Sequence, residues 1–221
     1  MKSDIRDAFY IACLIIPLLV VASSLVAVAH GAVLTLLGDY APMALAFLFV
    51  AGYGTFTAIL LSVLLARLPL REGDYPMDHS QFTLWKVQHV VAELGKLALS
   101  LFFPVFVRQV FYAIFGARVG KRVAVAGKVI DPRLTELDDD CILGEGCIVT
   151  SHAMVRDRFI LRRVRIGKGA TVGVGSILMP GVSIGAGAVL LPGSVLKAGT
   201  EVPPGETWGG IPAVRVRGAG G

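Results

Sequence analysis

A six-residue repeat runs without a gap from Ile166 to Thr207 and constrains the fold of this chain more than any other feature. The first residue of every hexad is aliphatic, the fourth is glycine, and the fifth is small in most repeats. The aliphatic positions are Ile166, Val172, Leu178, Ile184, Leu190, Leu196 and Val202, and the glycines are Gly169, Gly175, Gly181, Gly187, Gly193, Gly199 and Gly205. An α-helix, with about 3.6 residues per turn, does not produce this pattern.

The period predicts short β-segments separated by tight corners. A corner that needs a positive φ favours glycine, and the aliphatic and small positions then stack on themselves in successive coils. Three hexads make one triangular coil, so the repeat predicts a mainly β fold, a parallel β-helix. A glycine-rich flexible linker is the alternative, but it gives no reason to keep an aliphatic residue in strict phase.

The repeat resembles that of the left-handed β-helix hexapeptide-repeat acyltransferases. The residues WGGIPA from Trp208 to Ala213 are similar to the G-x-P-A element that closes such domains. The resemblance implies a left-handed coil, which is an exception to the usual right-handed crossover rule. It also implies homotrimers that bind acyl-CoA in the groove between neighbouring subunits.

Weaker hexads precede the strong repeat and begin at Val119. Their first positions stay in phase except at Asp131, where we expect a bulge or a loop. The phase slips again before Ile166. The segment 152–165 includes the large Phe159 and five arginines, which cannot all face a narrow core. We therefore expect a loop at 152–165 that leaves the coil and returns to it.

The apolar residues are concentrated before residue 70. The chain is 55% hydrophobic, with a mean hydropathy of +0.72, which is too apolar for an ordinary soluble domain. Residues 9–29 and 41–66 are uncharged apolar runs, each long enough to cross about 30 Å of hydrocarbon at roughly 20 residues. They predict a transmembrane hairpin of two helices at 1–70. The first run is longer than the apolar region of a cleaved signal peptide.

The distribution of basic residues predicts the orientation of this hairpin. Lys2 and Arg6 precede the first run, Arg67 and Arg71 follow the second, and the loop at 30–40 has neither Lys nor Arg. By the positive-inside rule both ends lie in the cytoplasm. This predicts a multi-pass protein of the inner, cytoplasmic membrane with its β-helix domain, 117–221, on the cytoplasmic side.

The net charge of +5 fits contact with anionic membrane lipid or with a polyanionic cofactor. No interleaved aromatic and basic pattern of a nucleic-acid module is present, so nucleic acid is not expected as a partner. The stretch GARVGKRV at 116–123 resembles the leading segment of membrane-linked hexapeptide transferases, including the C-terminal region of polylysine-synthetase-like proteins.

The sequence of residues 71–116 predicts an amphipathic connector that lies at the membrane interface. Apolar residues recur at three- and four-residue spacing from Leu84 to Leu101, and Pro104 interrupts the pattern. The alternative is a third span at 97–115. It would place Arg108 within the bilayer, at a cost of about 2.5 to 3.5 kcal/mol at mid-depth, and would move the β-helix to the outside. We favour the interfacial reading.

His152 is the only histidine of the predicted β-helix and occupies a corner position of its hexad. The family resemblance implies that it is the general base, and an imidazole that titrates near neutral pH suits that role. Asp157 is a candidate to orient the imidazole, although it could equally pair with a neighbouring arginine. Backbone N–H groups near Gly173 are candidates to stabilise the oxyanion.

Basic residues within and after this loop are candidates to bind the phosphates of acyl-CoA. The same side chains could hold acceptor phosphates or lipid headgroups, and the sequence leaves these roles open. The candidates for cofactor binding are Arg162, Arg163, Lys168, Gly173, Lys197, Arg215 and Arg217.

These features predict a membrane-anchored acyltransferase that uses acyl-CoA, with acetyl-CoA the expected donor. It would transfer the acyl group directly to a hydroxyl or amine of a membrane-associated or carrier-linked acceptor. Cys141 and Cys147 occupy small core positions, so no covalent intermediate is expected. No metal is expected. The related γ-class carbonic anhydrases use three histidines at each intersubunit site, and the predicted β-helix has one histidine per chain. The alternative function is a non-catalytic trimeric scaffold for a membrane complex.

Overall fold

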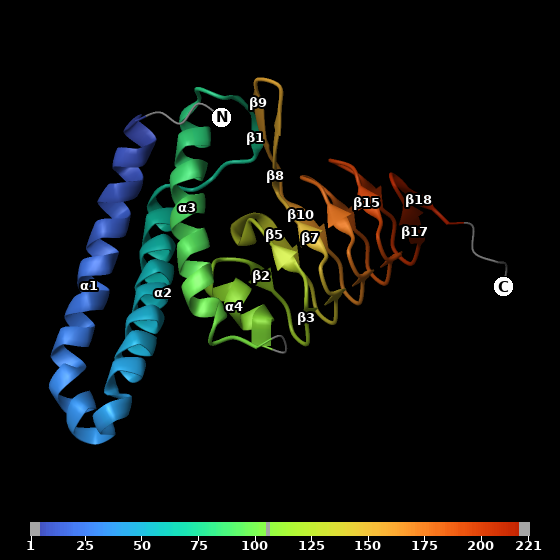
Figure 1. Ribbon diagram of the computed structural model, residues 1–221. Coiled ribbons are helices and arrows are strands. Elements are labelled where there is room, and N and C mark those ends of the chain that lie inside the picture. The colour runs from blue at the N-terminus through green and yellow to red at the C-terminus, as the bar shows by residue number, and fades with distance from the viewer. Residues whose placement is uncertain (1–4, 105–106, 217–221) are drawn as a thin grey trace. The chain divides into compact units, whose positions relative to one another are not determined.

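The computed structural model of the protein describes residues 5–104 and 107–216, apart from the side chains of Leu65 and Ala66 (Figure 1). Lys2 and Arg217 lie outside the described residues. The chain divides into a helical unit, residues 1–70 and 83–102, and a β-helix unit, residues 71–82 and 103–221. The connector predicted at 71–116 is therefore shared between the two units.

The helical unit consists of α1 (Ile5–Leu37), the 3₁₀ turn η1 (Gly38–Tyr40), α2 (Ala41–Arg67) and most of α3 (Ser80–Ser100). Helices α1 and α2 lie side by side and are joined at η1 (Figure 1). Gly38 has a φ of +49°, which suits the end of a helix, and Pro42 lies in the first turn of α2, where its missing N–H costs nothing.

Among the described residues, one helical run, Ile5–Leu64, is long and apolar enough to cross a membrane, and it includes α1, η1 and most of α2. Only 11% of its most apolar window is buried. The sequence predicted two membrane crossings. The structure gives one continuous run, and two crossings stay a proposal. The exposed large side chains of the run include Phe9, Leu19, Leu34, Phe47, Ile59 and Val63.

Helix α3 buries two lysines beside its apolar core residues and leaves other apolar side chains exposed. Lys86 and Lys96 are buried, and Lys86 forms an ion pair with the buried Asp7 of α1. A Cβ on Gly54 of α2 would lie 2.5 Å from Cγ of Leu99, so the two helices pack closely at this glycine. Exposed apolar residues of α3 and its end are Val90, Leu94, Leu97 and Leu101.

The β-helix unit is built from three parallel sheets, to which successive coils contribute one strand each (Figure 1). The first face contains β2 (Arg118–Val119), β5 (Thr135–Leu137), β10 (Val164–Ile166), β13 (Ser183–Ile184) and β16 (Glu201–Val202). The second contains β3 (Ala124–Val125), β6 (Ile142–Leu143), β11 (Thr171–Val172), β14 (Val189–Leu190) and β17 (Thr207–Gly210), with β18 (Ala213–Arg215) antiparallel to β17. The third contains β4 (Lys128–Val129), β7 (Ile148–Val149), β12 (Ile177–Leu178) and β15 (Val195–Leu196).

These sheets agree with the β-helix that the period predicts, while its left-handedness stays a prediction. The aliphatic first positions are at most 3% exposed and form the core. The seven fourth-position glycines have φ between 66° and 79°, a left-handed conformation that glycine adopts without strain. Gly173 is glycine for another reason, because a Cβ there would lie 2.4 Å from the backbone nitrogen of Pro192 in the next coil.

The first coil has a shortened corner. Only Ala126 and Gly127 separate β3 from β4, and Val129 of β4 pairs with Val149 of the next coil. This corner is shorter than the corresponding corners of later coils, and the chain makes up the difference at η3 (Pro132–Leu134). The expected irregularity at Asp131 is present, but the phase already slips at this earlier corner.

Helix α4 (Arg108–Ile114) covers the shortened corner. Arg108 donates to the carbonyl of Ala126 at 2.9 Å, and the hydroxyl of Tyr112 donates to the carbonyl of Gly127 at 3.2 Å. Helix α3 ends at Ser100 and α4 belongs to the β-helix unit, so these contacts argue against a third span at 97–115.

The loop expected at 152–165 is largely a β-hairpin, formed by β8 (His152–Val155) and β9 (Arg158–Leu161). A third strand, β1 (Gly73–Pro76), pairs antiparallel with β9 (Figure 1). Phe159, the large residue that could not fit the narrow coil, is fully buried, with its ring centroid 4.9 Å from that of Phe82. The hairpin therefore has an apolar anchor of its own, outside the coil.

Candidate functional site

His152 and Asp131 meet at the hairpin corner, the corner at which the chain passes from the third face to the first. Nδ1 of His152 lies 2.7 Å from Oδ2 of Asp131. The Asp131 side chain is 5% exposed and that of His152 is 20% exposed, so the carboxylate is covered while the imidazole reaches the surface. The same carboxylate oxygen accepts the backbone N–H of Ser151 at 3.0 Å.

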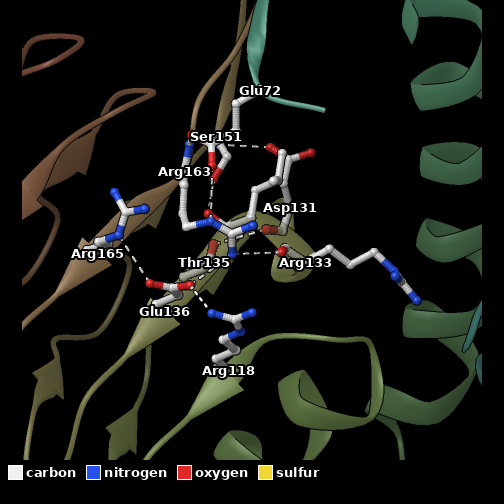
Figure 2. Close-up of polar contacts among 10 residues, drawn as sticks. Glu72, Arg118, Asp131, Arg133, Thr135, Glu136, Ser151, Arg163 and Arg165 are labelled. Atoms are coloured by element: carbon white, nitrogen blue, oxygen red, sulfur yellow. Dashed lines mark hydrogen bonds and ion pairs between the residues drawn. The ribbon is translucent and has the colours of Figure 1, made fainter. Parts of the chain in front are cut away.

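The position of Asp131 follows from the backbone around η3. Thr135 Oγ1 donates to the carbonyl of Asp131 at 3.0 Å, and Ser151 Oγ donates to the carbonyl of Leu134 at 2.8 Å (Figure 2). Thr135 and Ser151 are both fully buried. Since buried hydrogen bonds are costly to break, they hold η3, and with it the carboxylate, in one place.

This pairing determines what the imidazole can do. A carboxylate acceptor at Nδ1 favours the tautomer with its proton on Nδ1, which leaves the basic lone pair on Nε2. A buried carboxylate also stabilises the imidazolium that forms when Nε2 takes a proton. The arrangement suits a general base.

Asp157, which the sequence offered as the orienting residue, does not fill that role. It lies in the turn between β8 and β9, whereas His152 is at the other end of the hairpin, opposite Leu161. Its backbone carbonyl accepts the N–H of Met77 at 3.2 Å. Asp131 was missed, although a signal was present: it is an acidic residue at a hexad position that is otherwise aliphatic.

Arg162 lies at the hairpin corner with His152, and Lys197 lies on the same edge of the β-helix, two coils further along. The Arg162 side chain lies over the neighbouring corner, since a Cβ on Gly181 would be 3.2 Å from its Cδ, and its guanidinium is 3.2 Å from the carboxylate of Asp74. Lys197 lies in the corner that follows β15. The Arg162 guanidinium also reaches the corner of Lys197, because a Cβ on Gly199 would lie 3.9 Å from its NH1.

The other cofactor candidates lie elsewhere. Lys168 is at the corner between the first and second faces, Gly173 is at the corner between the second and third, and Arg215 is on β18 beside Glu206, at 3.3 Å. A single chain does not bring these residues to one groove.

Lys168 lies on the same edge of the β-helix as Asp140, one coil further along. The hydrogen bond from the Arg122 guanidinium, with a weaker contribution from the charge of Lys168, lowers the pKa of the Asp140 carboxyl.

Arg163 is engaged by protein groups on several sides. Its backbone N–H and Nε donate to Glu72 at 2.9 and 3.2 Å, and its NH1 donates to Glu136 at 3.1 Å and to the carbonyl of Arg133 at 3.4 Å (Figure 2). Glu136 also pairs with Arg118 and Arg165. These contacts indicate a structural use of Arg163, in place of the cofactor contact that the sequence suggested.

The cysteines of the coil are structural. Cys141 and Cys147 are fully buried, and burial raises the pKa of their thiols to about 12 and about 11. Thiols that stay protonated are poor nucleophiles. Within residues 5–104 and 107–216, no three His, Cys, Asp or Glu side chains are grouped as a metal site requires.

Residues 163–198 match the family model of the bacterial transferase hexapeptide, which describes six repeats. The match concerns the repeat and covers less than half of the chain. The matched segment covers β10 to β15, and both His152 and Asp131 precede it in the chain. No curated protein matches the chain.

Solved structures with the hexapeptide repeat resemble parts of the chain. An acetyltransferase from Vibrio cholerae O1 biovar eltor, complexed with acetyl-coenzyme A, is 22% identical over 46% of this chain and 60% of its own, with a TM-score of 0.43. A hexapeptide transferase family protein from Anaplasma phagocytophilum is 28% identical over 46% of this chain and 54% of its own, with a TM-score of 0.36. A maltose O-acetyltransferase from Clostridium difficile 630 is 17% identical over 66% of this chain and 92% of its own, with a TM-score of 0.47.

The chain spans 60% and 54% of the first two of these proteins. At TM-scores below 0.5, the likenesses decide neither the fold nor the activity of this chain.

Proposed function

We propose that this protein is a membrane-anchored acyltransferase that moves an acyl group, expected to be acetyl, from acyl-CoA to a hydroxyl or amine of a membrane-associated acceptor. The observation that carries the proposal is the Asp131–His152 pair, which lies beside a hexapeptide repeat of the transferase type. A non-catalytic scaffold would not need a surface imidazole held by a buried carboxylate.

In the proposed reaction, Nε2 of His152 takes the proton of the acceptor hydroxyl or amine while the acceptor atom attacks the thioester carbonyl carbon. The tetrahedral intermediate then expels the CoA thiolate, which receives the proton from the imidazolium. The products are the acylated acceptor and CoA with a free thiol. Asp131 keeps the imidazole in the required tautomer throughout, and general-base help of this kind contributes about 10² to 10⁴ in rate.

Binding of the donor would use the hairpin corner. In this proposal Arg162 and Lys197, which lie along one edge of the β-helix, bind phosphates of CoA, as guanidinium and ammonium groups commonly do. The Vibrio cholerae protein is complexed with acetyl-coenzyme A, which makes acetyl-CoA the first donor to test.

A homotrimer is the proposed assembly, and the outward side chains of the β-helix support it. On the first face charged residues point outward, whereas from the second coil onward the outward strand positions of the other two faces are uncharged. Two uncharged faces suit contact between copies related by symmetry. The outward residues are Arg118, Glu136 and Arg165 on the first face, Ile142, Thr171 and Val189 on the second, and Ile148, Ile177 and Val195 on the third.

The proposed membrane anchor is the hairpin of α1 and α2, with both of its ends in the cytoplasm and the β-helix on that side. The exposed apolar side chains of the run Ile5–Leu64 support it, because water disfavours a surface of this kind. The exposed apolar row from Val90 to Leu101 on α3 is consistent with a lipid-facing position for this helix as well. An anchor of this kind keeps the site near a lipid-linked acceptor.

The test is transfer of radiolabelled acetyl groups from acetyl-CoA into lipid extracts and into maltose, with the purified full chain and its His152→Ala variant. Acceptor-dependent transfer by the wild type that the variant lacks supports the proposal. Equal transfer by both proteins removes His152 as the base. Calorimetry with acetyl-CoA separates the alternative, since a folded wild type that does not bind it would be a scaffold.

A further inference from the structure

The segment that follows α2 is built into the hairpin corner. Residues 68–72 connect the end of α2 at Arg67 to β1, which pairs with the hairpin strand β9. Glu72, at the end of this segment, and Asp74, on β1, contact two consecutive arginines of the corner. Glu72 pairs with Arg163 and Asp74 pairs with Arg162.

The two pairs differ in what lies behind them. The Asp74–Arg162 pair is exposed, with side chains 40% and 48% accessible, and Arg162 continues over the corner glycines. The Arg163 side chain is 19% exposed and continues inward, where its NH1 donates to Glu136 and to the carbonyl of Arg133. Only the Glu72 pair therefore reaches η3.

The carbonyl of Arg133 lies in the middle of η3, two residues after Asp131. Arg163 thus holds η3 from one side, while Ser151 and Thr135 hold it through Leu134 and Asp131 (Figure 2). Glu72 binds both the backbone N–H and the Nε of Arg163, which fixes the direction of the guanidinium.

We infer that Glu72 is a positioning residue for the Asp131–His152 pair and acts on it through Arg163 and η3. Because Glu72 stands five residues after the end of α2, the inference links the end of the proposed anchor to the geometry of the proposed base. Its expected effect on kcat rests on the proposed function. Its expected effect on the position of the His152 ring can be measured without turnover.

The kinetic test compares Glu72→Gln with Asp74→Asn in the full chain, with release of the CoA thiol from acetyl-CoA measured in the presence of lipid extract. Glu72→Gln is expected to lower kcat about 3- to 10-fold without changing KM for acetyl-CoA, because a small misplacement of the base is costly. Asp74→Asn frees Arg162, a candidate for donor binding, and is expected to change KM and not kcat. In an Asp131→Asn background, Glu72→Gln should cause no further loss.

The geometric test follows the Nδ1-bound proton of His152 by NMR in protein labelled with ¹⁵N-histidine. The chain has four histidines, and the His152→Ala spectrum identifies the signal. Glu72→Gln is expected to shift or broaden this signal, whereas Asp74→Asn should leave it in place. Thermal unfolding confirms that both variants are folded.

An unchanged Nδ1 proton signal in folded Glu72→Gln protein overturns the inference, whatever the turnover. Full transfer activity in His152→Ala protein overturns the proposed function instead, and the NMR comparison still decides the role of Glu72. An equal fall of kcat in the Glu72 and Asp74 variants also overturns it, because the loss would then be a general loosening of the hairpin corner.

Discussion

Nδ1 of His152 lies 2.7 Å from Oδ2 of Asp131, although 21 positions separate the two residues in the chain. One turn of the β-helix brings them to the same corner. The carboxylate is buried, hydrogen-bonded by the N–H of Ser151, and aimed at the ring nitrogen that does not react. The pair has the geometry of an oriented base.

Replacing Asp131 by Asn should lower kcat at least about 10-fold, with acetyl-CoA binding retained. The Asn amide can donate to Nδ1 and favours the tautomer with a proton on Nε2, which removes base catalysis worth about 10² to 10⁴. Thiol release from acetyl-CoA measures kcat, and calorimetry measures binding. Asp157→Asn is the matched control and should keep its activity; equal losses in the two variants would count against the pair.

Two glycines of one corner should respond differently to alanine. Gly175→Ala introduces a Cβ into open space at a φ of +67°, so the cost is backbone strain of about 1 to 2 kcal/mol. Gly173→Ala should cost more, because the new Cβ meets the backbone at Pro192 and the adjacent coil has to move. Thermal unfolding of the two variants compares the costs, and a larger loss for Gly175→Ala would contradict this account of the coil.

The thiols of Cys141 and Cys147 should not react with maleimide at pH 8 until the protein unfolds, measured in a Cys13→Ser background. Their pKa values of about 12 and about 11 exceed the usual value of about 8.5, so ionisation favours the unfolded chain. Their contribution to stability is complete below about pH 8.5 and is lost as the pH rises towards 11 to 12.

Unfolding measured from pH 8 to 11 should accordingly show a falling stability. The fall should be smaller in a Cys141→Ala, Cys147→Ala variant, which has no thiols in the coil to ionise. The same slope in both proteins would show that these two groups do not contribute.

Phe159→Ala should destabilise the hairpin by about 3 to 5 kcal/mol, because Phe159 is fully buried against Phe82. Hydrogen exchange should show the loss first at the amides of β8, β9 and β1, since the coil has a core of its own. Phe159→Leu fills part of the space and should cost less. An equal increase of exchange over β10 to β15 would show instead that the hairpin and the coil unfold together.

In the helical unit, Lys86→Met should destabilise the protein by about 3 to 5 kcal/mol, because it removes the ammonium group that pairs with the buried carboxylate of Asp7. The double variant with Asp7→Leu should recover most of that loss, since both charges of the buried pair are then replaced by apolar groups. Thermal unfolding in detergent gives both values. A double variant that loses as much as the sum of the single variants would mean that the two residues are not coupled.

The repeat at 166–207 was enough to predict the coil, since corner glycines and stacked aliphatic residues are local requirements that recur in every hexad. The excursion at 152–165 was also predictable, because Phe159 and several arginines do not fit a narrow interior. His152 could be selected as the one histidine of that region. The residue types were sufficient in each of these cases, without knowledge of distant neighbours.

The partners of these residues depended on tertiary structure. Asp131 reaches His152 because a full coil returns the chain to the same corner, and the turn residue Asp157, much nearer in sequence, is carried away by the extended hairpin. Glu72 contacts Arg163 across 91 positions because β1 adds to the edge of that hairpin. Pairing across coils and strands depends on register and loop length, which act over the whole chain, so local residue patterns do not encode it.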